Sequence, residues 1–306
     1  MKKIVIILLI SLNFSCFSQS FNQQERQIIA YNILFGGING GIGAAINKPK
    51  HEKTTKAFIK GFYKGCIGGT LMYAGKRTSA LIKIEATKHD QITSMFRSDF
   101  RYNSFGYGWA GKLIHTTGAS IVENASTGRG FLEDWTMDYG PIRMSFNTKN
   151  LSPSFRLKAE GSYRFIQLFF HGKLSIKKSL LIGTPYFISN PEYAELDFNG
   201  RHKAGSIIVN EGHLANVHQV TTHEYIHSLQ ERENSIYLYL TYKTNSKFMN
   251  KYGSYKFIGK YLCVEPIYVS TVRWIIQPSR ENYFKSYSEM EAQHIATNQY
   301  VSPKLP

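Results

Sequence analysis

Two glycine-rich segments constrain the fold of this 306-residue chain more than any other feature. They are IIAYNILFGGINGGIGAAIN at residues 28–47 and FIKGFYKGCIGGTLMYAGK at residues 58–76. Small residues recur at every fourth position in both, namely Gly37, Gly41 and Ala45, then Gly61, Gly65 and Gly69. On two helices this spacing gives smooth stripes along which the backbones can approach closely. Each glycine costs about 1 kcal/mol relative to alanine inside a helix, so close packing must compensate. The sequence therefore predicts a tightly packed helical hairpin.

Two environments suit this hairpin. The first segment is just long enough to span a bilayer, but Asn32 and Asn39 interrupt it. Lys60 and Lys64 make the second segment amphipathic. One interpretation is therefore membrane contact through residues 28–76, and the other is a pair of core helices in a soluble α+β domain.

The middle of the chain predicts a third helix and then a sheet. The small-residue segment WAGKLIHTTGASIVENAS, residues 109–126, is expected to pack on the hairpin. Alternating and β-branched or aromatic residues follow in DWTMDYG, IRMSFNT, SFRLKAEGSYRFIQLFF and KLSIKKSLLIG. An antiparallel sheet over residues 134–210 is the simplest interpretation. The predicted class is α+β, divided into residues 1–20 (signal peptide), 21–130 (glycine-rich helices) and 131–306 (sheet and metal-binding region).

The N-terminal residues are typical of an export signal. Two lysines precede an apolar run from Ile4 to Ile10, and Ser18 and Ser20 suit an ordinary signal peptidase. Cys16 is the alternative, as a lipid-attachment cysteine after an imperfect lipobox. Both alternatives indicate an exported protein that is periplasmic or associated with the cell envelope.

The formal net charge is +16 at pH 7. For an exported protein the expected counter-charges are anionic lipid, surface polysaccharide or an acidic substrate. No nucleic-acid partner is expected, because no nucleic-acid motif is present. Cys66 and Cys263 either form a disulfide or remain separate thiols.

The motif with the clearest chemistry is His-Glu-x-x-His at residues 223–227, within VTTHEYIHSLQ. On a helix, His223 and His227 share one face, so both imidazoles can bind one zinc ion. Glu224 can then act as general base toward a zinc-activated water. The preceding GSIIVN, residues 205–210, is predicted to be a strand.

A catalytic zinc site needs a third protein ligand and one open position. Glu231 and Glu233 lie too near the motif on its own helix to fold back over the ion. Glu265 stands in the apolar segment YLCVEPIYVS, whereas Glu289 and Glu291 belong to a predicted short helix, YSEMEAQHIATNQY. These three carboxylates are the candidates.

HEYIH followed downstream by EMEAQHIA resembles the gluzincin class of zinc metallopeptidases. The similarity is greatest to the minimal forms and to membrane peptidases related to the prenyl-protein endopeptidase, and it covers about residues 205–296. It implies that the metal ligands and the base are His223, His227, Glu289 and Glu224.

The resemblance has further implications. Glu291 becomes the third ligand if the register is shifted. Gln293 stands where the membrane peptidases carry an Asp that orients a ligand histidine, which implies lower metal affinity or turnover. In such proteins the strand before the metal helix pairs with an extended peptide, a role that GSIIVN would take. Other candidates for oxyanion stabilisation are His213, His218 and His294.

The sequence thus predicts an exported zinc metallopeptidase that hydrolyses a peptide or protein substrate. The alternative belongs to another class of protein. It is a non-enzymatic envelope protein whose hairpin and basic surface hold a membrane or a partner, with a structural or degenerate metal site.

Overall fold

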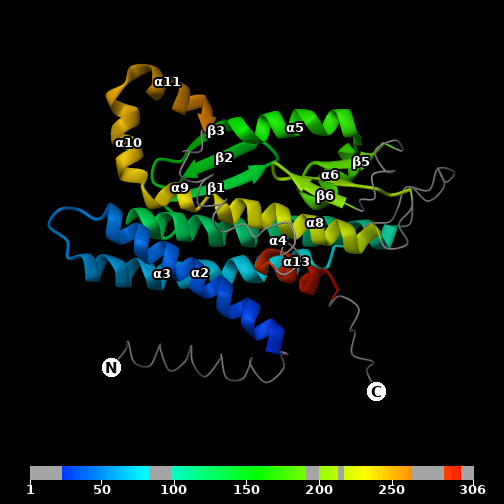
Figure 1. Ribbon diagram of the computed structural model, residues 1–306, viewed down its shortest axis with the longest axis horizontal. Coiled ribbons are helices and arrows are strands. Elements are labelled where there is room, and N and C mark those ends of the chain that lie inside the picture. The colour runs from blue at the N-terminus through cyan, green and yellow to red at the C-terminus, as the bar shows by residue number, and fades with distance from the viewer. Residues whose placement is uncertain (1–22, 83–97, 191–199, 213–216, 264–285, 298–306) are drawn as a thin grey trace.

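The computed structural model describes residues 23–82, 98–190, 200–212, 217–263 and 286–297, so the predicted signal peptide lies outside the described residues. The class is mixed α+β, as predicted. Three long N-terminal helices pack together, and two small sheets lie on the other side of a central helix, α8 (Figure 1).

The three N-terminal helices confirm the predicted helical segments. Their bounds are α2 (Gln23–Asn47), α3 (Thr54–Ser79) and α4 (Ser98–Thr127). The glycines bring α2 and α3 into direct backbone contact, since a Cβ on Gly65 would lie 2.1 Å from the carbonyl oxygen of Gly36. A Cβ on Gly69 would lie equally close, 2.1 Å, to the carbonyl oxygen of Asn32. Only glycine permits this approach.

The strands form two mixed sheets, so the prediction of one antiparallel sheet over residues 134–210 is wrong. The first sheet has the order β1 (Asp134–Tyr139), β2 (Ile142–Asn147), β3 (Ser152–Lys158) and β8 (Leu262–Cys263), with β8 parallel to β3. The second has the order β4 (Gly172–Leu174), β5 (Tyr186–Ser189), β7 (Ser206–Val209) and β6 (Gly200–Lys203), with β5 parallel to β7. Parallel pairs join segments far apart in sequence, which alternation alone cannot reveal.

Two segments predicted as strands are largely helical, as α5 (Ala159–His171) and α6 (Ile176–Ile182). In α5, Phe165 and Phe169 are four residues apart and both pack edge-on against Phe187, a helical spacing. In α6, Ser175 caps the first turn and Gly183 ends the helix with a left-handed φ of 70°. Helical packing and capping therefore outweigh the β-branched composition.

The C-terminal part is helical. It comprises α8 (Val217–Asn234), α9 (Tyr237–Leu240), α10 (Tyr242–Lys251), α11 (Gly253–Tyr261) and α13 (Tyr287–Thr297). The central core cluster surrounds α8, where Tyr225, Ile226 and Leu229 pack with Ile207 of β7 and Ile295 of α13. The predicted metal helix is thus fixed between the second sheet and α13.

Two other predictions can be compared with the fold. GSIIVN does form a strand, β7, but β7 lies between β5 and β6, so it is not the edge that an extended peptide could join. Cys66 on α3 and Cys263 on β8 are both free thiols, so the alternative of a disulfide between them is wrong.

Among the described residues, α2 is the one helix long and apolar enough to cross a membrane by length and composition. Half of its most apolar window is buried against the protein. A core helix or a signal sequence meets the same criterion, so this property of α2 gives only weak support for a membrane role.

Candidate metal centre

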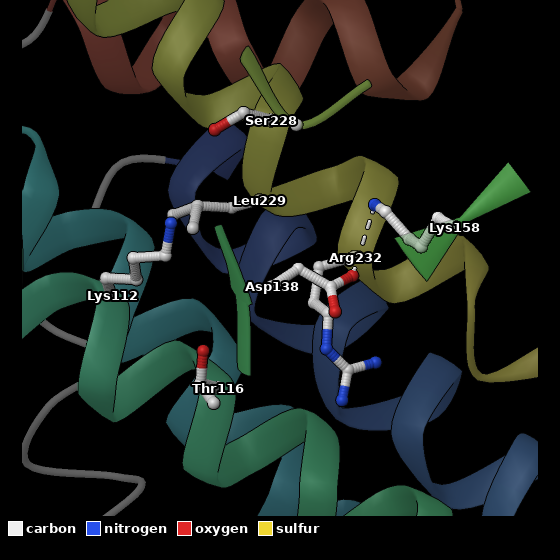
Figure 2. A pocket seen from close by; sticks show the side chains of 8 residues that line it. Lys112, Thr116, Asp138, Lys158, Ser228, Leu229 and Arg232 are labelled. Atoms are coloured by element: carbon white, nitrogen blue, oxygen red, sulfur yellow. Dashed lines mark hydrogen bonds and ion pairs between the residues drawn. The ribbon is translucent and has the colours of Figure 1, made fainter. Parts of the chain in front are cut away.

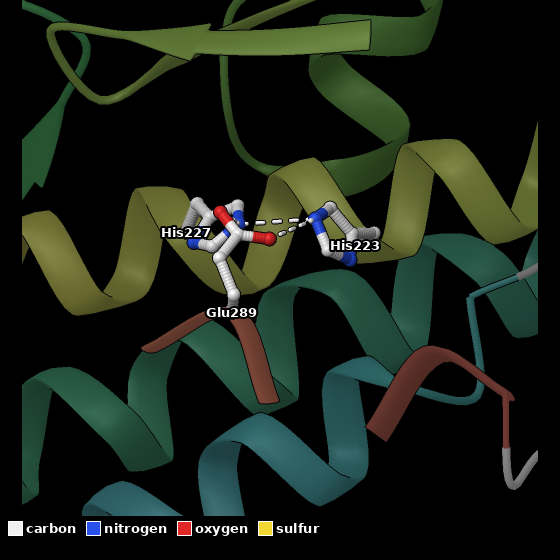
Figure 3. A group of neighbouring side chains, drawn as sticks. All are labelled: His223, His227 and Glu289. Carbon is white, nitrogen blue, oxygen red and sulfur yellow. Dashed lines mark hydrogen bonds and ion pairs between the residues drawn. The ribbon is translucent and has the colours of Figure 1, made fainter. Parts of the chain in front are cut away.

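Three of the predicted site residues converge on one point. His223 and His227 come from α8 and Glu289 from α13, and one ligand atom of each lies within 4.8 Å of the others (Figure 3). The two Nε2 atoms are 3.0 Å apart. The Glu289 oxygens lie 3.2 Å from Nε2 of His223 and 3.0 Å from Nε2 of His227.

These separations fit a small cation. Ligand bonds of about 2.0–2.1 Å in a tetrahedral site put neighbouring ligand atoms about 3.3 Å apart. Two imidazole nitrogens and one carboxylate oxygen form a donor set that Zn²⁺ accepts. His223, His227 and Glu289 can therefore hold a metal ion.

His227 is oriented by a residue that the sequence did not suggest. Its Nδ1 lies 2.7 Å from Oε1 of Gln230, one turn along α8. An amide oxygen only accepts, so Nδ1 carries the proton and the lone pair of Nε2 is available to a metal ion. The Gln230 amide nitrogen donates to Glu291 Oε2 at 2.8 Å and to the Ser288 carbonyl at 3.0 Å, which fixes its orientation.

Glu291 connects the metal centre to the glycine-rich hairpin. Its carboxylate accepts from Nδ2 of Asn32 at 2.6 Å and from Nζ of Lys76 at 2.8 Å. Lys76 is completely buried and also lies 2.7 Å from Glu233 of α8. Nε2 of His115 on α4 is 3.0 Å from the same carboxylate. A buried polar network, comprising Gln230, Glu291, Asn32, Lys76, Glu233 and His115, thus runs from the ligand His227 to all three N-terminal helices.

The charges in this network determine its protonation. Burial opposes the charge on Lys76, but the carboxylates of Glu233 and Glu291 outweigh it and raise the pKa of Lys76. Burial also opposes the charge on Glu233, yet Lys76 and His115 lower the pKa of that carboxyl group. Burial lowers the pKa of His115, which is therefore neutral near pH 7. One ammonium is thus shared by two carboxylates.

Glu224 is buried beside the three converging residues, with 8% of its surface exposed. Burial raises the pKa of its carboxyl group, against the opposing effect of His227 and His223. The carboxylate accepts a hydrogen bond from the backbone N–H of His202, and its Oε2 lies 3.9 Å from Nδ1 of the same residue. Glu224 is therefore held between α8 and β6.

His202 is a site residue that the sequence did not reveal. Its ring stacks on His227, with centroids 5.0 Å apart and planes 29° apart. Burial and the charge of His227 lower the pKa of His202, so its imidazole is neutral at pH 7. Among the described strands, β6 is the edge next to α8, and His202 lies opposite Ile207 there. That register depends on the β6–β7 pairing, which no motif in the sequence indicates.

The other candidates lie elsewhere. Glu291 and Glu233 belong to the buried network, and Gln293 is exposed, so it does not orient a ligand histidine. Glu231 accepts from the Gly205 N–H at 2.8 Å. His294 pairs with Glu25, and His218 lies in the first turn of α8 outside the converging group. Glu265 and His213 lie outside the described residues.

A second polar cluster lies on another face of α8, around a small cavity lined by Lys112, Asp138, Lys158, Arg232 and their neighbours (Figure 2). Arg143 donates twice to Asp138, at 2.8 and 2.9 Å. Burial opposes the charge on Asp138, but Arg143, Lys158 and Arg232 hold the pKa of its carboxyl group well below its usual range. Burial lowers the pKa of Lys112 to about 7. This cluster connects α4, α8 and the first sheet.

Comparisons of the chain with protein-family models, with curated proteins and with solved structures gave no match. The resemblance to gluzincins therefore depends on the His-Glu-x-x-His motif and on the convergence of His223, His227 and Glu289.

Proposed function

We propose that this chain is an exported zinc-dependent metallopeptidase. The observation that carries the proposal is the convergence of His223 and His227 from α8 with Glu289 from α13, beside the buried Glu224. Two imidazoles from one helix and a carboxylate from another share one point, and these are donor atoms that a zinc site uses.

Each residue has a role in the proposed hydrolysis. Zinc held there would supply a Lewis acid for the scissile carbonyl and would lower the pKa of water. Glu224 takes the proton of the attacking water and later returns it to the leaving nitrogen. Its raised pKa suits both transfers, because the carboxyl group titrates closer to neutral pH. Gln230 keeps the lone pair of His227 Nε2 directed at the ligand site.

The strand next to Glu224 is β6, and it takes the role that the sequence assigned to GSIIVN. In the proposed complex an extended peptide lies along this edge strand and forms main-chain hydrogen bonds with it. His202 projects from the same strand beside His227, where a neutral imidazole can donate to the oxygen of the scissile carbonyl.

Metal content and turnover of matched variants test the proposal. Wild-type protein, His227→Ala and Glu224→Gln are measured by mass spectrometry for zinc and are incubated with a mixed peptide library. We expect near-stoichiometric zinc in the wild type and in Glu224→Gln, loss of zinc in His227→Ala, and cleavage by the wild type alone. Zinc-free wild type in a well-folded state, or cleavage by Glu224→Gln, would exclude the mechanism.

The alternative is a non-enzymatic envelope protein with a structural metal site. His202 is the residue to test, because its imidazole lies beside His227. A structural site fills all four positions, whereas a catalytic one leaves one position for water. Cobalt substitution reports this difference in the visible spectrum. If His202→Ala changes the cobalt spectrum as a lost ligand does, His202 closes the site and the protein is not a hydrolase. An unchanged spectrum supports the peptidase.

A further inference from the structure

Helix α2 turns its apolar side chains outward and its polar side chains inward. Between Ala30 and Ile46 every exposed residue is apolar, and the large side chains among them are 41–53% exposed, namely Tyr31, Leu34, Ile38, Ile42 and Ile46. The buried side of the same helix carries glycines together with Asn32, Asn39 and Asn47. A helix that faces water has the opposite arrangement, with its polar side outward. The outer side of α2 is therefore suited to contact with an apolar environment.

Helix α3 continues this apolar surface. The ring of Phe58 covers Gly41 of α2, where a Cβ would lie 2.8 Å away, and the ring of Phe62 covers Gly37 at 3.0 Å. Helix α4 packs on the hairpin as well and closes another of its sides. Figure 1 shows α2 and α3 on the side of the molecule away from the sheets and α5. We name the exposed apolar side chains of α2, with Phe58 and Phe62, the hairpin face.

One end of the hairpin face is strongly basic. The turn from α2 to α3 and the first turns of α3 carry five lysines and one acidic residue, which are Lys48, Lys50, Lys53, Lys56, Lys60 and Glu52. Four of the lysines are exposed, and Lys60 pairs with Glu52 at 2.8 Å. Each lysine close to an anionic bilayer contributes about 1 kcal/mol of attraction. An apolar surface bordered by lysines matches acyl chains bordered by anionic headgroups.

We infer that the hairpin face rests on a lipid bilayer with anionic headgroups. Its aliphatic side chains enter the boundary of the acyl region, and the lysines of the turn lie among the headgroups. The hairpin lies on the bilayer and does not cross it, because the other side of α2 buries asparagines against the protein. A protein partner fits less well, since the centres of protein interfaces are rich in arginine, whereas the hairpin face has no arginine and its basic residues are lysines gathered at one end. This inference is independent of the proposed hydrolysis.

Another exposed apolar surface provides a matched control. Helix α5 exposes Tyr163, Ile166 and Phe170, and it lies on the opposite side of the molecule from the hairpin (Figure 1). It differs from α2 in two respects, since Leu168 on its inner side is buried with Phe187 and Ile208 and its outer side includes the exposed Arg164. The bilayer is therefore expected to contact α2 and to leave α5 in water.

Site-specific fluorescence tests which surface meets lipid. The full chain, with its native cysteines replaced by serine, carries one fluorophore at Ile42→Cys or at Phe170→Cys. It is mixed with vesicles of phosphatidylglycerol and phosphatidylcholine whose acyl chains are brominated. We expect quenching at position 42 and none at position 170. Quenching at position 170, at both positions or at neither would overturn the inference.

Vesicle binding of unlabelled variants provides a second test. Ile38→Gln/Ile42→Gln should weaken co-sedimentation with anionic vesicles by roughly tenfold or more, through loss of buried aliphatic area. Ile166→Gln/Phe170→Gln should bind as the wild type does, and circular dichroism should show both variants folded. Wild-type binding should weaken with added salt and in neutral vesicles.

Three results of this second test would overturn the inference. The first is undiminished binding by Ile38→Gln/Ile42→Gln, and the second is binding that does not respond to lipid charge. The third is a lipid-free wild-type dimer that the Ile38→Gln/Ile42→Gln variant converts to a monomer in light scattering, because the hairpin face would then belong to a second copy of the chain. None of these readings involves zinc or turnover, so they leave the proposed function untouched.

Discussion

At the scale of single residues, the amide of Gln230 orients His227, a candidate metal ligand, at a position where a carboxylate is common. The negatively charged group next to Gln230 is Glu291, whose Oε2 accepts from the Gln230 amide nitrogen at 2.8 Å. Glu291 therefore acts on His227 only through Gln230. This arrangement orients the imidazole without a carboxylate in direct contact with its Nδ1. Gln293, which is exposed on α13, is therefore not needed to orient His227.

The role of Gln230 can be measured as metal affinity. Gln230→Leu removes the acceptor for His227 Nδ1, and we expect zinc to bind about 10- to 100-fold more weakly. Competition with a chromophoric chelator gives the dissociation constant. Gln293→Leu is the matched control, because its side chain is exposed and should leave the constant unchanged. Equal affinities for the two variants would show that Gln230 has no orienting role.

Protons compete with the metal at His227. Burial opposes the charge on this imidazole, but its hydrogen bond to the Glu289 carboxylate and the charges of Glu224 and Glu289 raise its pKa above the ordinary 6.5. A raised pKa means that the metal-free ring takes its proton at a higher pH than an ordinary histidine does. Zinc affinity should therefore begin to fall before the pH reaches 6.5 and should decline by about tenfold per pH unit below the pKa.

Chelator competition between about pH 8 and pH 5 checks this pH dependence. Glu289→Gln removes the hydrogen-bonding carboxylate and should both weaken zinc binding and move the onset of the decline to lower pH. An affinity that stays constant throughout this range would mean that zinc does not bind through His227.

At the scale of elements, the contact between α2 and α3 tolerates glycine alone. Gly65→Ala puts a Cβ 2.1 Å from the Gly36 carbonyl oxygen, so the helices must separate. We expect the free energy of unfolding to fall by about 2–4 kcal/mol, as for overpacking in a rigid core. Urea denaturation followed by circular dichroism measures the change.

Gly106→Ala on α4 is the control for that experiment. Nothing lies within 4 Å of a Cβ at Gly106, so alanine should stabilise the helix by up to about 1 kcal/mol. If the two substitutions change the stability alike, the effect comes from helix propensity and not from the close contact.

Elements with strong local signals were predictable from the sequence, and those defined by distant contacts were not. Glycine spacing predicts α2 and α3, and the motif spacing predicts the helix that carries His223 and His227. By contrast, α5 has a composition suited to strands, and its helical state depends on packing against Phe187. The edge position of β6 depends on its pairing with β7, and the short polar sequence of β6 does not predict that pairing.

At the scale of the whole molecule, the buried network connects the hairpin to the candidate metal centre. Lys76 of α3 is completely buried between Glu233 of α8 and Glu291 of α13. The sequence predicts the metal ligands from spacing and resemblance, but nothing in it assigns a partner to Lys76. From the sequence, Glu291 is expected only as a possible ligand, and the network that it forms with Asn32, Lys76 and Gln230 is recognisable only once the fold brings these residues together.

Removal of the buried ammonium should destabilise the whole fold. Lys76→Met leaves two carboxylates without their shared cation, and we expect a loss of about 3–5 kcal/mol in the free energy of unfolding. Adding Glu291→Gln should recover part of that loss, because one buried charge is removed with its partner. Lys60→Met, which breaks an exposed ion pair with Glu52, should leave the stability nearly unchanged. Equal effects of Lys76→Met and Lys60→Met in urea denaturation would contradict a structural role for the network.

The contact between the two glycine-rich helices also limits how the sequence can change during evolution. A substitution at Gly36, Gly65 or Gly69 would place a Cβ within 3 Å of backbone on the opposite helix, whereas most exposed positions of the chain are free to drift. Over long divergence, these glycines should outlast the sequence around them. Distant relatives could then be recognised by the spacing of the glycines before any overall similarity remains, and the spacing would record shared ancestry even in lineages that have lost the histidines.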